Sequence, residues 1–191
     1  MIRTTFHWRD VASRPRGGAG FTLLEVLAVI VILGILGAVG WKYFSTDRTK
    51  ATALLERAQE VARGLILFKQ DVSCYPATLD ALYERSRAQN TQCGIDGRPS
   101  WREPYISRAE FTATGSLSVA DLVSGAAMSL ASQPGGAGQQ WLVRVSGVPS
   151  DLLQKVAETC NGGTASTGRC SIAAGGSSGT GTFDLLFDET T

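Results

Sequence analysis

The chain has 191 residues and a formal net charge of +1, which favours one modest domain and excludes a bulk electrostatic attraction for nucleic acid. Four arginines against Asp10 give residues 1–20 a net charge of +3, so the rest of the chain carries −2. His7 is the only histidine, so no histidine after it can serve as a catalytic base.

Residues 1–20 are interpreted as a leader peptide. By the positive-inside rule, its basic charge keeps this segment in the cytoplasm. The end of the leader contains Pro15 and three glycines, the last of which is Gly20. Such a segment is extended and flexible, as is typical of a protease substrate.

An apolar run from Phe21 to Trp41 follows the leader, and Glu25 is its only charged residue. A helix of that length spans about 30 Å, the thickness of the hydrocarbon core of a bilayer. We therefore expect a transmembrane helix at residues 21–45 and a globular head domain at residues 46–191, across the membrane from the leader. Cleavage by an ordinary signal peptidase is disfavoured, because residues 37–40 make a poor Ala-x-Ala-like site.

Glu25 is out of place in a simple anchor, since a carboxylate in a membrane segment costs roughly 2.5–3.5 kcal/mol. Such a residue is expected to have a function and a partner charge. If the chain were cut after Gly20, Phe21 would carry a positive amine that a neighbouring copy could offer to Glu25. The alternative is a carboxylate that simply reaches the headgroups at the membrane surface.

The segment Gly20-Phe21-Thr22-Leu23-Leu24-Glu25-Val26 resembles the type IV prepilin signature. The resemblance implies that a prepilin peptidase cuts after Gly20 and N-methylates Phe21. It also implies a filament with a core of packed helices, in which Glu25 pairs with the Phe21 amine of an adjacent subunit. The long leader resembles the type IVb subclass, although phenylalanine at the cut site is more typical of the short-leader subclass.

Residues 46–72 are expected to continue as an amphipathic helix, because apolar residues recur there at three-and-four spacing. Glu60 and Arg63 lie on the polar side and are expected to form an ion pair. No proline interrupts residues 21–72, so one bent helix is plausible. The resemblance implies the type IV pilin fold, an α+β fold in which a long N-terminal helix packs on an antiparallel sheet. The apolar positions are Ala51, Leu54, Leu55, Ala58, Val61, Ala62, Leu65 and Phe68.

The four cysteines, Cys74, Cys93, Cys160 and Cys170, all lie in the part expected to be exported. An even number in an oxidising compartment indicates two disulfides. The local pairing, Cys74–Cys93 with Cys160–Cys170, is preferred, and the crossed pairings stay open. A zinc site is disfavoured, because the chain has no Cys-x-x-Cys motif.

Pro76 and the two residues before it should end the long helix, because the residue before a proline avoids helical backbone. Residues 74–108 are expected to form a disulfide-bonded loop that Trp101 and Tyr105 anchor to the core. Residues 109–191 complete the head. The expected elements after the long helix are a short helix at 78–85, strands at 110–114 and 116–119, a helix at 121–131, a turn at 134–138, a strand at 140–145, a helix at 149–157, a Gly/Ser/Thr-rich segment at 161–181 and a strand at 182–187.

No catalytic site is expected. Residues 175–179 match the Gly-x-Ser-x-Gly pattern of serine hydrolases, but they lie in a low-complexity segment without the flanking strand and helix that this motif needs. A phosphate-binding loop motif is missing from the sequence. We therefore predict a non-enzymatic protein without cofactor or metal.

The favoured function is a structural subunit, a major pilin, of a type IV pilus. It would act with copies of itself, the prepilin peptidase, the inner-membrane assembly machinery and the membrane, first in the inner membrane and then in an extracellular filament. One alternative is a minor pilin, a competence protein or an adhesion protein that binds DNA or a surface ligand. A type II secretion pseudopilin is another, and an anchored periplasmic enzyme is more remote. The arginines that suggest DNA binding are Arg85, Arg87, Arg98, Arg102 and Arg108.

Overall fold

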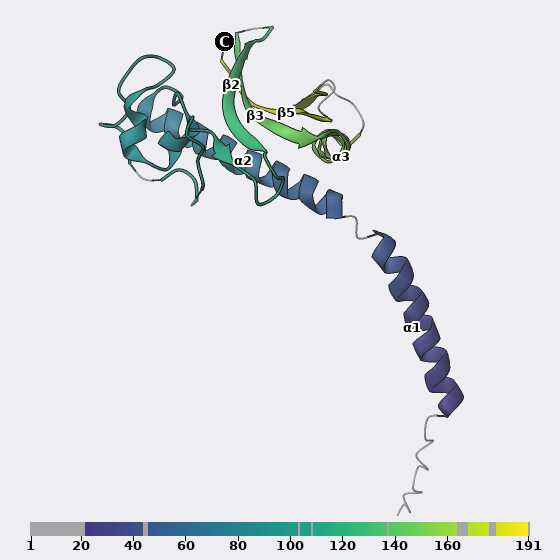
Figure 1. Ribbon diagram of the computed structural model, residues 1–191. Helices are drawn as coiled ribbons and strands as arrows, with labels where there is room; N and C mark the ends of the chain where they lie inside the picture. The colour runs from purple at the N-terminus through teal and green to yellow at the C-terminus, as the bar shows by residue number, and fades with distance from the viewer. Residues whose placement is uncertain are drawn as a thin grey trace, which may run out of the picture. The chain divides into compact units, whose positions relative to one another are not determined.

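The computed structural model describes residues 22–43, 46–102, 104–107, 109–136, 138–163, 168–175 and 179–190. The chain divides into two compact units, Met1–Phe44 and Ser45–Thr191. We call them the N-terminal unit and the head (Figure 1). The predicted leader, residues 1–20, lies outside the described residues.

The N-terminal unit contains one described helix, α1, at Leu23–Tyr43. Its sequence is apolar on every side, so no stripe of the helix is marked out to face a core. Residues 44 and 45 lie outside the described part of the chain. The prediction that one helix runs unbroken from residue 21 to residue 72 therefore stays a prediction.

The head begins with α2 at Thr46–Val72, the bounds that the sequence predicts. All eight apolar positions expected to face a core, from Ala51 to Phe68, are buried. Three-and-four spacing places these side chains on one face of the helix, which explains why the prediction is confirmed. The helix ends at Ser73, whose φ of 64° is the left-handed conformation that often closes a helix.

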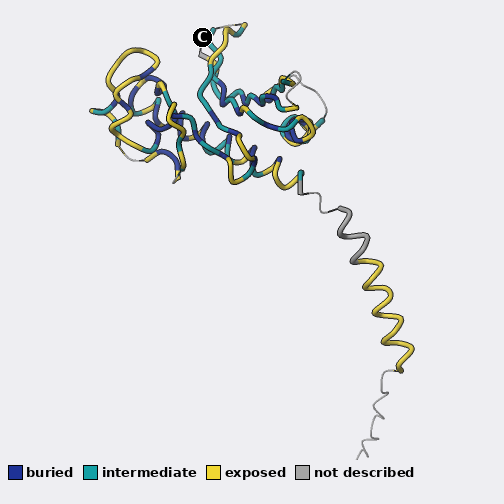
Figure 2. Tube along the Cα trace, viewed as in Figure 1, coloured by how far each residue is buried: buried dark blue, intermediate teal, exposed yellow. Residues whose placement is uncertain are grey.

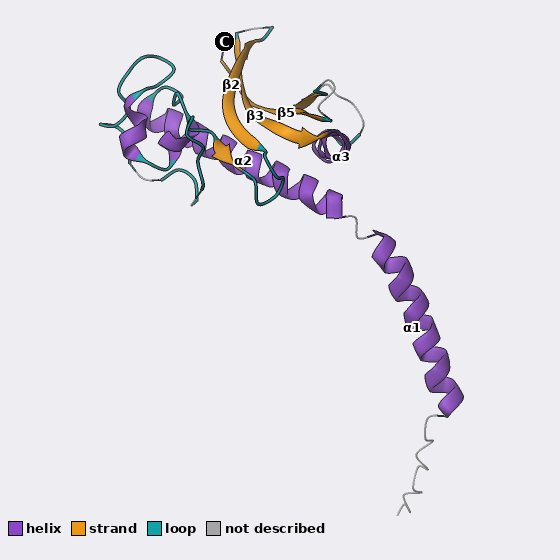
Figure 3. Cartoon of the chain, in the orientation of Figure 1, coloured by secondary structure: helices purple, strands orange, loops and turns teal. Residues whose placement is uncertain are grey.

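A five-stranded antiparallel sheet packs against α2, in the order β1-β2-β3-β5-β4 (Figure 3). This arrangement confirms the predicted α+β, pilin-like fold. Sheet residues that face α2, such as Met128, Val143, Phe183 and Leu185, are fully buried, and buried segments line both α2 and the sheet in Figure 2. The strands are β1 at Leu117–Ser118, β2 at Ala127–Pro134, β3 at Gln139–Pro149, β4 at Cys170–Ala173 and β5 at Thr180–Thr190.

Two different parts of the chain complete the cover of α2. Helix α3, at Ser150–Asn161, packs against its first half, where Lys155 Nζ lies 2.6 Å from Asp47 Oδ2. The loop after α2 covers its second half, where the Phe68 and Tyr105 rings meet edge to face at 5.4 Å. Each half of α2 is thus buried by a different segment, and each of those segments contains a disulfide.

The loop that follows α2 contains two short 3₁₀ helices, η1 at Leu79–Leu82 and η2 at Arg85–Gln89, in place of the single helix predicted at 78–85. Trp101 and Tyr105 anchor this loop, as expected. Trp101 Nε1 donates to the Ala81 carbonyl at 2.9 Å, and Tyr105 Oη donates to Asp71 Oδ2 at 3.0 Å.

The predicted helix at 121–131 is wrong, because most of the second half of this segment belongs to β2. Gly125 has a φ of 77°, which a right-handed helix does not contain. Met128 and Leu130 pair with Val145 and Val143 of β3. The small, apolar residues fit a helix by local propensity, but the ladder with β3 prevails because it pairs the backbone of β2 along its length and buries Met128.

Three further predictions need correction or completion. The strand expected at 110–114 is reduced to a single bridge between Phe111 and Leu117. The Gly/Ser/Thr-rich segment contains β4, a strand that the sequence did not suggest. Glu60 forms its ion pair with Arg57, at 2.8 Å, instead of the expected Arg63. The turn at 134–138, the strands at 140–145 and 182–187 and the helix at 149–157 lie within or between the observed elements.

Candidate functional site

The start of α1 contains the described part of the predicted assembly motif. The Glu25 backbone N–H donates to the Thr22 carbonyl at 3.0 Å and to Thr22 Oγ1 at 3.3 Å. Thr22 therefore caps the helix, and Glu25 occupies its third position, as in the first half of a capping box. Gly20 and Phe21, the predicted cleavage residue and new N-terminus, lie outside the described residues.

The Glu25 side chain is exposed, and no hydrogen bond or ion pair of its carboxylate occurs among the described residues. A carboxylate in the first turn faces the positive end of the helix dipole, which favours it there. The predicted partner, the amine of Phe21 from another copy, involves residues outside the description. Its role in assembly therefore stays a proposal.

Residues 22–36 are all exposed, on every side of α1 (Figure 2). Leu23 is 84% exposed, Leu27 is 57% exposed and Leu33 is 62% exposed. Exposed apolar surface of this extent marks a contact with a membrane or with other protein chains. Among the residues that the structure describes, no helix is both long and apolar enough to cross a membrane.

A polar cluster joins the end of α2 to the end of β5. Asp188 Oδ2 accepts hydrogen bonds from Lys69 Nζ and from Tyr75 Oη, both at 2.5 Å. Lys69 Nζ also lies 4.8 Å from the centre of the Tyr75 ring. This cluster could not be predicted from sequence spacing, because Asp188 lies more than a hundred positions from both Lys69 and Tyr75.

The cluster shifts the pKa values of two of its members. Burial raises the pKa of the Tyr75 hydroxyl well above its usual value, and the hydrogen bond to Asp188 raises it further. Burial alone would also raise the pKa of Asp188, but the hydrogen bonds from Lys69 and Tyr75 outweigh burial and hold it below its usual value. Tyr75 therefore stays neutral and Asp188 stays ionised at neutral pH, so the hydrogen bonds that link α2 to β5 are kept. We call Lys69, Tyr75 and Asp188 the clasp.

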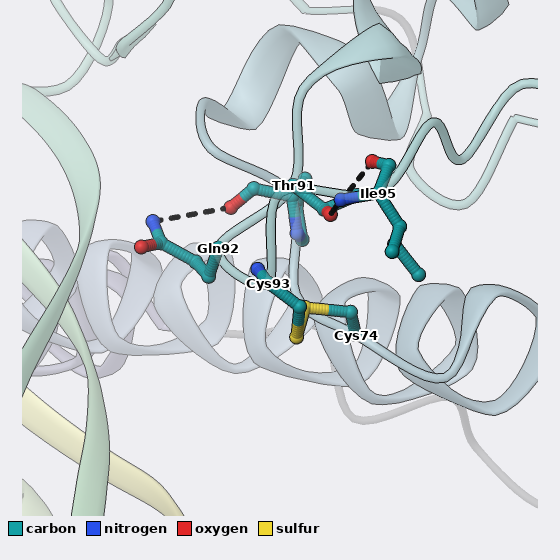
Figure 4. Close-up of a disulfide and its surroundings, with 6 residues drawn as sticks. Cys74, Thr91, Gln92, Cys93 and Ile95 are labelled. Atoms are coloured by element: carbon teal, nitrogen blue, oxygen red, sulfur yellow. Dashed lines mark hydrogen bonds between the residues drawn. A yellow bond between two sulfur atoms is a disulfide. The ribbon is translucent and has the colours of Figure 1, made fainter.

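The two disulfides of the structure link Cys74 to Cys93 and Cys160 to Cys170. The first joins the end of α2 to the loop, where Thr91 and Ile95 hydrogen-bond around a tight turn (Figure 4). The second joins the end of α3 to β4. Both bridges have a Cα–Cα separation of 6.2 Å, within the usual range for a disulfide.

The arginines that suggested DNA binding are largely committed to carboxylates. Arg98 makes a two-pronged contact with Asp96, at 2.7 Å for Nη2–Oδ2. Arg102 Nε lies 3.4 Å from Asp71 Oδ1. Arg87 Nε lies 3.6 Å from Asp80 Oδ2, Arg85 donates to the Arg98 carbonyl, and Arg108 lies outside the described residues. A guanidinium group that already pairs with a carboxylate contributes less to neutralising phosphates and so to releasing counterions from a nucleic acid, which weakens the case for a nucleic-acid surface.

The described residues contain no group of three or more histidine, cysteine, aspartate or glutamate side chains placed to hold a metal ion. The described cysteines are all in disulfides, so none of them is a free nucleophile. The motif at residues 175–179 begins beside β4 and β5 and extends beyond the described residues.

Comparison with known proteins gives consistent similarities. Residues 16–41 match the family model described as the prokaryotic N-terminal methylation motif. The chain is 32% identical over 122 residues to the type II secretion system core protein G of Pseudomonas aeruginosa, which covers 57% of this chain and 83% of that protein. The protein of the same description from Xanthomonas campestris pv. campestris is 29% identical over 121 residues, which cover 61% of this chain and 85% of that protein. The one from Aeromonas hydrophila is 39% identical over 80 residues, which cover 39% of this chain and 56% of that protein. No solved structure gives a significant match to the chain.

The extent of these alignments is informative. The methylation motif occupies only residues 16–41, so most of the 122 aligned residues lie outside it. The similarity therefore includes part of the head as well as the N-terminal signature. A methylation motif alone would be compatible with any prepilin-like protein, whereas likeness in the head restricts the family.

Proposed function

Because this chain belongs to the family of the type II secretion system core protein G, we propose that it is a pseudopilin, a subunit that polymerises through its apolar N-terminal segment within a type II secretion machinery. The observation that carries the proposal is the alignment over 83% of the Pseudomonas aeruginosa relative. The chain is a structural, non-enzymatic member of the pilin and pseudopilin families. The N-terminal signature alone predicted a major type IV pilin, with the pseudopilin as an alternative, and the relatives favour that alternative.

We propose that a prepilin peptidase removes residues 1–20 by cutting after Gly20 and that Phe21 becomes an N-methylated N-terminus. The match of residues 16–41 to the methylation motif supports this maturation. Before assembly, residues 21–45 anchor the chain in the inner membrane and the head lies outside the cytoplasm. The two disulfides of the head suit such an oxidising compartment.

Assembly then transfers the apolar surface of α1 from lipid to neighbouring subunits. Apolar packing alone is a poor determinant of axial register, because many offsets bury similar areas. A carboxylate at Glu25 penalises every offset that leaves it buried without a partner charge. Glu25 is therefore proposed to set the register by pairing with the Phe21 amine of an adjacent subunit.

The first experiment distinguishes secretion from a surface pilus. The gene is deleted in its native host, and both the proteins in the culture supernatant and the filaments sheared from the cell surface are compared with the parent strain. Loss of secreted proteins with unchanged surface filaments is expected. Normal secretion with loss of surface filaments would overturn the proposal in favour of a type IV pilus subunit.

The second experiment tests Glu25 by complementing the deletion with Glu25→Val or with Glu56→Val, which removes an exposed carboxylate from α2. Glu25→Val should leave the protein level and membrane fraction unchanged but reduce secretion strongly, whereas Glu56→Val should restore it. An intact mass of the wild-type protein checks the maturation. A chain that begins at methylated Phe21 is expected, and a chain that begins at Met1 would contradict it.

A further inference from the structure

The two cysteine residues of the Cys74–Cys93 disulfide differ in their exposure to solvent. Cys74 follows the end of α2 and is only 3% exposed, because it lies among core residues. Cys93 is an exposed residue on the loop that turns above it (Figure 4). A molecule in solution therefore meets this disulfide from the Cys93 side.

The second disulfide is more protected. Cys170 is fully buried, and Cys160 is half-buried at the end of α3. The Asn161 side chain also holds the backbone of Cys170 on both sides, with Nδ2 donating to its carbonyl at 2.8 Å and Oδ1 accepting from its N–H at 3.1 Å. This pair of bonds fixes β4 against the end of α3 and limits any approach to the bridge.

Access decides which sulfur takes part in thiol–disulfide exchange, because an incoming thiolate must reach the sulfur that it attacks. We propose that Cys93 is the sulfur through which the head exchanges disulfides with external thiols, and that Cys74 is the leaving and resolving thiol. The partner class is a small thiol or an exported dithiol oxidoreductase. The assignment does not depend on whether the chain serves in secretion.

The exchange is balanced as follows. An external thiolate attacks Cys93 Sγ, a new mixed disulfide forms there, and the bond to Cys74 breaks with its electron pair leaving on Cys74 Sγ. During maturation the reverse occurs: the Cys74 thiolate attacks Cys93 Sγ in a mixed disulfide with an oxidised dithiol protein and expels that protein as a thiolate. The two electrons and two protons of Cys74 and Cys93 pass to the oxidant in the complete reaction.

The surroundings of Cys74 keep it close enough to resolve such an adduct. The Cys93 N–H donates to Cys74 Sγ at 3.0 Å. Backbone bonds from Gln92 N–H to the Tyr75 carbonyl, at 2.8 Å, and from Ala77 N–H to the Asn90 carbonyl, at 3.1 Å, hold the two arms of the loop together without the disulfide. Opening the S–S bond at Cys93 therefore does not require the loop to leave α2.

The stability of the Cys74 thiolate does not reverse the assignment of Cys93 as the attacked sulfur. Cys74 comes shortly after the carbonyl end of α2, whose partial negative charge opposes an anion. The N–H donor from Cys93 acts in the opposite direction. With these two influences opposed, the difference in exposure between the two cysteine residues governs the reaction.

The test uses the folded, oxidised full chain in detergent with reduced glutathione as the probe. Short incubations are quenched with acid, and the adducts are mapped by peptide mass spectrometry without reduction. The first adduct is expected on Cys93, forming about tenfold faster than any adduct on Cys160 or Cys170. A first adduct on Cys74 or on the second disulfide would overturn the assignment.

Variants that replace one cysteine of this disulfide give an independent measurement of the relative reactivity of Cys74 and Cys93. Cys74→Ser leaves Cys93 as a free thiol, and Cys93→Ser leaves Cys74. Alkylation by a maleimide should be about tenfold faster in Cys74→Ser, and the two rates should become equal in denaturant. Equal rates in the native chain would count against the proposal, and if either variant fails to fold, the glutathione mapping of the wild-type chain decides.

Discussion

Tyr75 donates its hydroxyl hydrogen to Asp188 across 113 positions of sequence, at an Oη–Oδ2 distance of 2.5 Å. A β-bulge makes this possible. In the pairing of β3 with β5, Trp141 lies opposite Asp188 while Leu142 lies opposite Leu186, so Phe187 is an extra residue. Both Phe187 and Asp188 then reach Tyr75, and the bond ties the last strand of the head to the end of α2.

Asp188→Asn should lower the free energy of unfolding at pH 7 by about 1–3 kcal/mol, because Lys69 and Tyr75 lose an ionised acceptor. Urea unfolding followed by tryptophan fluorescence measures this, since Trp141 packs on Tyr75 at 4.6 Å. Asp121→Asn, at an exposed aspartate, is the matched control. Equal midpoints for the two variants would contradict a stabilising clasp.

The same bond predicts a pH dependence with a definite sign. The pKa of Asp188 is lower in the folded chain than in the unfolded chain, so its stabilisation is complete above the ordinary aspartate pKa of about 4. It should be lost as the pH falls from there through the folded value. The difference in unfolding free energy between wild type and Asp188→Asn should therefore shrink on acidification, and a difference that grows would refute the assignment.

Phe68→Ala should destabilise the head by about 3–5 kcal/mol, because it empties a fully buried position between α2 and Tyr105. Its neighbour provides a control on the same helix turn. Leu67 is 49% exposed, so Leu67→Ala should change stability by less than about 1 kcal/mol. Thermal unfolding of both variants, followed by far-UV circular dichroism, tests the predicted direction in which α2 faces the core.

Two residues with left-handed backbone predict changes of opposite sign. Ser73 has a φ of 64°. Ser73→Gly should raise the free energy of unfolding by about 1 kcal/mol, because glycine adopts this conformation without strain. Gly162 closes α3 with a φ of 69°, and a Cβ added there would meet no atom within 4 Å. Gly162→Ala should therefore destabilise by a similar amount, through the backbone alone. Urea midpoints that shift in the same direction would contradict this account.

Gly64 separates helix propensity from packing. Alanine favours a helix over glycine by about 1 kcal/mol. A Cβ at Gly64, however, would lie 2.9 Å from the Tyr105 carbonyl oxygen and 2.7 Å from Ile106 Cγ2. Because a backbone atom cannot simply move aside, Gly64→Ala should destabilise the head by about 1–3 kcal/mol. Gly34→Ala in α1, where a Cβ meets nothing within 4 Å, should raise helix content, as circular dichroism in detergent can measure.

The elements that were predicted correctly depend on residues close together in the sequence, and those that were missed depend on residues far apart. The bounds of α2 and its buried face were predictable, because the spacing of its apolar residues is a local property. Residues 121–131 were mistaken for a helix, because their strand state depends on β3, which comes later in the chain. β4 was not predicted for the same reason. Ile172 is its only large apolar residue, so the sequence shows no strand pattern, and the strand depends on its pairing with β5.

The candidate site shows the same limit. The N-terminal signature was recognisable because Gly20, Phe21 and Glu25 are close in sequence. The partner of Glu60 was assigned to Arg63, whereas the side chain pairs with Arg57 and accepts from Ser107 Oγ at 2.6 Å. Both arginines are at a distance of three from Glu60, so sequence spacing could not choose between them. The hydrogen bond from Ser107 holds the Glu60 carboxylate where it pairs with Arg57.

The two covers of α2 also differ in the sequence distance that they close. Asp71 and Tyr105 are 34 positions apart, whereas Asp47 and Lys155 are 108 positions apart. Closing a longer loop costs more chain entropy, and contacts between distant residues form more slowly. The end of α2 and its disulfide loop therefore make up the fast-forming part of the head. The start of α2, which follows the apolar N-terminal segment in the sequence, is covered only after the last third of the chain is in place, so this end of the helix is the last to become rigid.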